Sequence, residues 1–184
     1  MKTFTSIILF ALVVIQSAFG QSLVKSATKI PEGWKELKGE NYWLMYPQEW
    51  ELNSSGEMGS TFVVLSPVTS TDDRFRENVN LMIQDLKGYN VNLEMFTEVS
   101  EEQVRTLVPE GNILESTLIT GNTLNFQKTI YTGKQGDFDM IFEQYYWVEG
   151  EKAFVLSFTC EENQYEVYKT IGEKILNSFQ LFVH

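Results

Sequence analysis

The sequence predicts an α+β protein in which a twisted antiparallel β-sheet is flanked by helices. Three observations lead to this prediction: apolar and aromatic runs of strand length fill both halves of the chain, tight turns join consecutive runs, and only two segments space their apolar residues as a helix does. Strands joined by tight turns must run antiparallel. Two amphipathic helices need an apolar surface to cover, and the sheet supplies one.

The chain divides into three parts of unequal length. Residues 1–20 combine Lys2, a short apolar run and small residues at Ala18 and Gly20, which is typical of a signal peptide cut after Gly20. The apolar run is shorter than the roughly 20 residues that span a bilayer. Residues 21–30 suggest a flexible lead, and residues 31–184 suit one domain. We therefore expect an exported protein, periplasmic or extracellular, that is not inserted in a membrane after cleavage.

The first half of the domain holds short strands. They are expected at residues 34–38, 42–46, 61–66 and 78–84. The second of them is aromatic and stops at Pro47, which cannot donate a hydrogen bond to a neighbouring strand. In the last, Val79, Leu81 and Ile83 alternate with polar residues, which predicts that one face of this strand lies in the core.

A helix is predicted next, over residues 93–107, where apolar residues recur every three to five positions. Asn92 can cap its start, and Pro109 follows its end. Ser100 and Gln103 have the spacing of a capping box, so a break near Ser100 is an alternative to one continuous helix.

A meander of four strands and a closing helix complete the prediction. The strands are expected at residues 113–120, 123–132, 137–148 and 152–160, and the helix at residues 163–177. Gly121-Asn122 is a two-residue hairpin signal between the first two strands, and residues 133–136 are the expected turn before the third.

Three short motifs carry a resemblance to a known family. They are Tyr-Trp-Leu-Met-Tyr-Pro-Gln-Glu-Trp at residues 42–50, Phe-Arg-Glu-Asn-Val-Asn at residues 75–80 and Ile-Leu-Asn-Ser-Phe at residues 175–179. In order and spacing, over residues 31–182, they resemble the PsbP-like family. The resemblance implies an antiparallel sheet with helices on both sides. Plant members are extrinsic subunits of the oxygen-evolving complex of photosystem II, and many bacterial relatives are exported, so the resemblance implies binding to another protein rather than catalysis.

Candidates for catalysis or metal binding are few. The chain has one histidine, His184, and one cysteine, Cys160, whereas imidazole-based catalysis and zinc sites need positioned or clustered side chains of these types. The sequence also has no glycine motif of the kind that cradles phosphates. We therefore predict no catalytic residue, no cofactor and no metal site. Cys160 alternates with Phe158 and Leu156, which predicts a buried, inert thiol.

Three carboxylates offer one alternative to the prediction that the chain has no catalytic or metal site. Asp137 and Asp139 are two apart on a predicted strand, with Glu143 further along, and such a group could bind a hard cation or serve as acid and base. A solvated strand end after a turn is the interpretation that we favour. The four tryptophans are expected in the core rather than in a ligand site.

The net charge of the chain limits the classes of partner that it can bind. Twenty-five acidic residues against 14 basic ones give a net charge of −11, which repels phosphate backbones and excludes nucleic acid as a partner. The leading hypothesis is a non-enzymatic accessory protein that docks to another protein in the envelope or outside the cell. Its candidate contact loop holds Asp72, Asp73 and Arg74. The alternatives are a small-ligand carrier, with its pocket between a helix and the sheet, and a carboxylate-based hydrolase.

Overall fold

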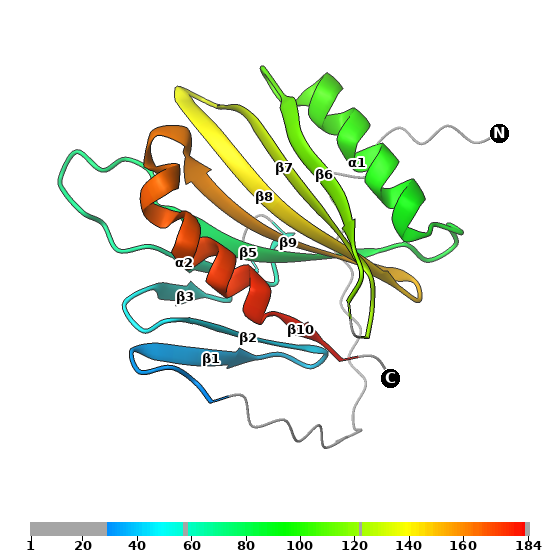
Figure 1. Ribbon diagram of the computed structural model, residues 1–184, viewed down its shortest axis with the longest axis horizontal. Helices are drawn as coiled ribbons and strands as arrows, with labels where there is room; N and C mark the ends of the chain where they lie inside the picture. The colour runs from blue at the N-terminus through cyan, green and yellow to red at the C-terminus, as the bar shows by residue number, and fades with distance from the viewer. Residues whose placement is uncertain (1–28, 57–58, 122, 183–184) are drawn as a thin grey trace.

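The computed structural model describes residues 29–56, 59–121 and 123–182, and the predicted signal peptide lies outside them. Two antiparallel sheets and two α-helices make up the fold, which confirms the α+β prediction (Figure 1). A small sheet has the order β1-β2-β10 and a large one the order β3-β4-β5-β9-β8-β7-β6. The strands divide into two sheets instead of one, because β1 and β2 pair with each other and with the end of the chain and not with the large sheet.

The bounds of the elements are as follows. The small sheet contains β1 (Trp34–Lys38), β2 (Tyr42–Pro47) and β10 (Gln180–Leu181). The large sheet contains β3 (Glu51–Asn53), β4 (Phe62–Leu65), β5 (Asn78–Asp85), β6 (Asn112–Ile119), β7 (Phe126–Gln135), β8 (Phe138–Glu149) and β9 (Lys152–Glu161). The helices are α1 (Leu93–Leu107), the short 3-10 helix η2 (Glu162–Gln164) and α2 (Tyr165–Ser178).

The two helices cover opposite faces of the large sheet. Helix α2 packs on β9, β5 and β2, and α1 packs on β6, β7 and β8 (Figure 1). On β8, Tyr145 belongs to the core on the α2 side, whereas the next residue, Tyr146, belongs to the core on the α1 side. Successive side chains of a strand point to opposite faces, so the sheet is covered on both.

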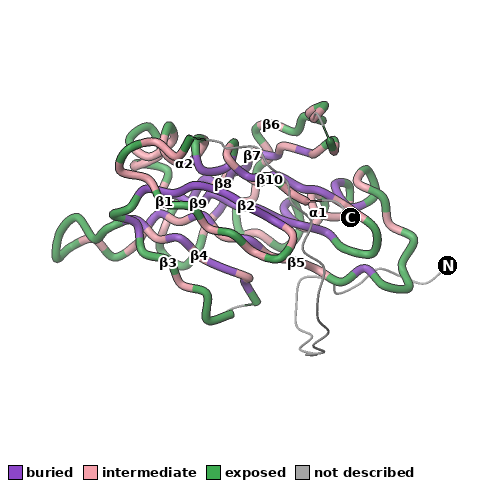
Figure 2. Tube along the Cα trace, turned by 90° about the horizontal axis from the view of Figure 1, so that it is seen from below, coloured by how far each residue is buried: buried purple, intermediate pink, exposed green. Residues whose placement is uncertain are grey.

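The core on the α2 side is the larger of the two. It joins α2 to the small sheet through residues such as Leu44, Leu81, Leu156 and Ile175, all of which are fully buried. Figure 2 shows buried residues running along β2, β8 and β9. The core on the α1 side is small, and this difference leaves room for the pocket described below.

Helix α1 is continuous, so the predicted break near Ser100 does not occur. The side chain of Asn92 caps the helix by accepting a hydrogen bond of 2.9 Å from the backbone N–H of Met95. The hydroxyl of Ser100 donates instead to the carbonyl oxygen of Phe96, at 2.8 Å, within the same helix.

Two turns differ from the sequence-based expectation. Ile119 pairs with Phe126, so the predicted two-residue hairpin at residues 121–122 is wrong and a longer connection joins β6 to β7. Gly133 lies inside β7, opposite Met140, and the turn comes three residues later, at Gly136 and Asp137. Gly133 serves packing instead, because a Cβ there would lie 2.4 Å from Cγ1 of Val108.

Candidate functional site

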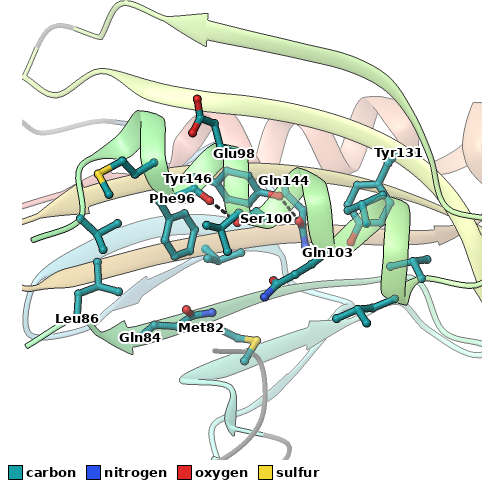
Figure 3. Close-up of a pocket in the computed structure, with 17 residues that line it drawn as sticks. Met82, Gln84, Leu86, Phe96, Glu98, Ser100, Gln103, Tyr131, Gln144 and Tyr146 are labelled. Carbon is teal, nitrogen blue, oxygen red and sulfur yellow. Dashed lines mark hydrogen bonds between the residues drawn. The ribbon is translucent and has the colours of Figure 1, made fainter. Parts of the chain in front are cut away.

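A cavity of about 470 Å³ lies between α1 and the large sheet (Figure 3). Sites for small molecules are typically concave, mostly apolar and about 300–1,000 Å³ in volume. The apolar lining includes Met82, Leu86, Phe96, Val99, Leu107 and Val155. The polar lining consists of Gln84, Glu98, Ser100, Gln103 and Gln144, together with the hydroxyls of Tyr131 and Tyr146.

Four neighbouring strands form the floor of the pocket, β7 through Tyr131 and the other three through a row of paired residues. Met82 of β5 pairs with Val155 of β9, which pairs in turn with Tyr146 of β8, so the three side chains form a row across the sheet. The next position along β5, on the same face, is Gln84, and its partner on β9 is Ala153.

Helix α1 forms the roof. Phe96 and Val104 are buried and anchor the helix, and the Phe96 ring meets the Tyr146 ring edge-on at a centroid distance of 5.6 Å. Other side chains of the helix remain open to solvent although they line the cavity: Met95 is 42% exposed and Leu107 is 69% exposed. The helix therefore closes the pocket only in part.

Some polar groups of the pocket already form hydrogen bonds with neighbouring residues, and others do not. The amide of Gln144 accepts a hydrogen bond from the hydroxyl of Tyr146 at 2.5 Å and donates one to the hydroxyl of Ser157 at 2.8 Å. The amide oxygen of Gln84 is buried, and no hydrogen-bond donor among the described residues reaches it. Burial also raises the pKa of Tyr131 and Tyr146, so both phenols are neutral at ordinary pH.

The structure places the predicted contact loop apart from this pocket, since none of its three residues lines it. Asp72 is exposed. Asp73 accepts hydrogen bonds from the backbone N–H of Thr69, at 2.8 Å, and from its hydroxyl, at 3.0 Å, which hold the pKa of Asp73 below its usual value. The guanidinium of Arg74 lies over the ring of Phe138, 5.4 Å from its centroid. The backbone N–H of Asp72 donates a hydrogen bond of 3.3 Å to the hydroxyl of Ser70, whereas the side chain of Asp72 is exposed.

The structure separates the three candidate carboxylates. Asp137 is exposed in the turn, and Asp139 is exposed with one oxygen 3.5 Å from Nζ of Lys134. Glu143 is fully buried on the α2 side, where its carboxylate lies 3.4 Å from Nζ of Lys128. A solvated strand end describes the two aspartates, whereas Glu143 is a core residue. Among the described residues no group of three acidic, histidine or cysteine side chains could hold a metal ion.

Cys160 and the tryptophans lie where the sequence predicts. Cys160 is fully buried, and its thiol donates to the carbonyl oxygen of Glu161 at 3.2 Å. Trp43, Trp50 and Trp147 are buried, and Trp34 packs against the core at its margin.

Comparison with known proteins gives matches of structure but not of sequence. No protein-family model and no curated protein matches the chain. Its structure is similar to that of cyanobacterial PsbP (CyanoP) from Synechocystis, with a TM-score of 0.59 and 11% identity, over 87% of this chain and 99% of that one. The chain has a PsbP-like fold.

Two further structures share this PsbP-like fold. LpqN of Mycobacterium tuberculosis, which is involved in cell envelope biogenesis, has a TM-score of 0.59 at 9% identity and covers 82% of this chain and 91% of its own. A protein of unknown function from Pseudomonas aeruginosa has a TM-score of 0.54 at 9% identity, over 79% and 94% of the two chains. Likeness at such low identity establishes the fold and leaves function to the site. No helix in the described part of the chain is long and apolar enough to cross a membrane.

The sequence predicts a possible pocket between a helix and the sheet but identifies none of its residues. In β5 the alternation of Val79, Leu81 and Ile83 with polar residues predicts one buried face, so Gln84 is expected on the opposite face. One signal was available: Met82 is apolar on the otherwise polar face, and it indicates that this face is also covered.

Proposed function

We propose that the protein is a non-enzymatic accessory protein that acts by binding, and that the pocket between α1 and the sheet holds a small, mainly apolar ligand. The observation that supports this proposal is the cavity of about 470 Å³, lined mostly by aliphatic, methionine and aromatic side chains. Burial of apolar surface is the main favourable term in such binding. A ligand seated there would also cover Met95 and Leu107, which are apolar yet exposed.

The proposal is tested by filling the pocket. Val99 lines it from α1 and is partly buried, so Val99→Trp would occupy the space that a ligand needs. Val167 is 68% exposed on α2, on the other face of the sheet, and Val167→Trp is the matched control. The probe is N-phenyl-naphthylamine, a neutral dye whose fluorescence rises in apolar sites.

We expect the wild type and Val167→Trp to bind the dye. Val99→Trp should bind it at least about tenfold more weakly, which corresponds to a loss of about 1.4 kcal/mol in binding free energy. Circular dichroism shows whether each variant is folded. Equal dye binding by all three folded proteins, or no binding by the wild type, would contradict the proposal.

Docking to another protein is the second candidate function, and Asp72 is the observation that favours it. The loop is held in place through Asp73 and Arg74, while the carboxylate of Asp72 faces solvent. On a chain of net charge −11, such a group favours a basic partner surface. Asp72→Lys should weaken capture of an envelope partner, whereas Asp137→Lys, at an exposed turn elsewhere, should not. Asp73 is unsuitable for this test because its carboxylate holds the loop.

A further inference from the structure

We infer that the pocket selects an uncharged amphiphile that donates a hydrogen bond, such as a long-chain alcohol or amide, over a fatty acid of the same length. This inference rests on the proposed function and adds the chemical class of the ligand. It depends on the charge around the pocket and on one buried acceptor.

The inside of the pocket offers no counter-ion to an anionic ligand. Of the described residues that line it, Glu98 is the only one with a charged side chain, and it is acidic. In Figure 3 the Glu98 carboxylate points away from Leu86, Gln84 and Met82, so the floor itself is uncharged. A carboxylate moved from water to this floor would lose its hydration without gaining a cation, which is costly.

Helix α1, which forms the roof of the pocket, is acidic. Helix α1 carries Glu94, Glu98, Glu101 and Glu102 against one basic residue, Arg105, which is paired with Glu101 at 2.7 Å. The whole chain has a net charge of −11. An anionic headgroup bound beneath this helix therefore meets a net negative field, and a neutral headgroup avoids this repulsion.

The buried acceptor is the amide oxygen of Gln84. It receives no hydrogen bond from the described residues, whereas the amide of Gln144 already accepts one hydrogen bond from Tyr146 and donates one to Ser157. A buried acceptor left unpaired destabilises a protein. Gln84 lines the pocket and is only partly buried as a residue, so its side chain can turn this oxygen toward a ligand, and a ligand that donates to it gains more than an apolar ligand of the same shape. In Figure 3 Gln103 extends from α1 toward β5, where Gln84 and Met82 lie, which places a second amide on the same side of the pocket.

The test is a displacement series with ligands of equal chain length. Decane, decanol, decanamide and decanoate compete with N-phenyl-naphthylamine on the wild type, at a pH where decanoate is ionised. We expect decanol and decanamide to bind at least about tenfold more tightly than decanoate, as a charge without a partner requires. We also expect them to bind about 5- to 10-fold more tightly than decane, the effect of one hydrogen bond.

Two variants assign these preferences to residues. Gln84→Leu keeps the size of the side chain and removes the acceptor, so the preference for decanol over decane should disappear. Gln135→Leu, at an exposed position of β7, is the control and should keep it. Circular dichroism and dye binding report whether each variant is folded and has an open pocket.

The outcomes separate the inference from the proposed function. If neither the dye nor any of the four compounds binds the wild type, the proposed function fails. If the compounds bind and decanoate matches decanol, or Gln84→Leu keeps the preference for decanol, the pocket exists and the inference about its ligand is wrong.

Discussion

Two carboxylates buried on the α2 side of the sheet govern how the stability of this protein depends on pH. Burial raises the pKa of both Glu77 and Glu143, and Lys128 offsets part of that effect at Glu143. Each binds its proton more tightly in the folded than in the unfolded state. The free energy of unfolding therefore falls as pH rises from the ordinary pKa of glutamate through the raised value, and it recovers when pH is lowered.

This argument predicts a gain in stability on mild acidification. As the pH is lowered from neutral toward the ordinary pKa of glutamate, about 4.3, the urea midpoint of the wild type should rise, and the rise should be smaller in Glu77→Gln, whose side chain does not ionise. Glu40→Gln, an exposed position between β1 and β2, is the control and should keep the wild-type slope. If the urea midpoint of Glu77→Gln changed with pH as steeply as that of the wild type, burial of Glu77 would not raise its pKa, which would contradict the argument.

At the scale of elements, the packing of α2 on β9 depends on the absence of a side chain at Gly172. A Cβ at this helical position would lie 2.6 Å from the ring of Phe158, which is fully buried. Replacing glycine by alanine inside a helix ordinarily stabilises it by about 1 kcal/mol. Here the clash reverses the sign, because the buried ring has little freedom to move.

We therefore expect Gly172→Ala to lower the free energy of unfolding by about 1–3 kcal/mol, the usual cost of overpacking a core. Urea unfolding measures the change. Thr170→Ala, at an exposed position of the same helix, controls for helix propensity. A Gly172→Ala protein more stable than the wild type would mean that the contact with Phe158 is not tight.

Local signals in the sequence predict most elements, and they fail where contacts distant in sequence decide. Helix α1 begins and ends at its predicted residues because Asn92 and the apolar spacing are local features. Gly133 carries a turn signal, yet it lies in a strand because Val108 approaches it from the segment that follows α1. Strand β10 exists only through its pairing with β2, more than a hundred residues earlier, and no local pattern indicates it.

The candidate site, like β10, depends on contacts between residues that are far apart in the sequence. Residues from α1, β5, β7, β8 and β9 contribute to it, and because these elements lie far apart along the chain, the pocket is recognisable only once the sheet order is known. The sequence predicts a possible pocket between a helix and the sheet but identifies none of its lining residues. It does not predict that α1 covers this face only in part.

At the scale of the whole molecule, the two faces of the large sheet differ in purpose. The α2 side joins the small sheet, α2 and the large sheet into one extensive core, which supplies stability. The α1 side has a small core and an open cavity, which leaves apolar surface free for a ligand. Under the proposed function, the α1 face would bind the ligand while the α2 face keeps the protein folded.

The most direct test of this account is a titration of the wild type with decanol, followed by backbone amide chemical shifts. We predict that the shifts change in α1, in β5 near Met82 and Gln84, and in β9 near Val155, and that α2 and the small sheet remain unaffected. Changes confined to α2 and the small sheet, or no change at saturating decanol, would contradict the claim that the pocket between α1 and the sheet is the binding site.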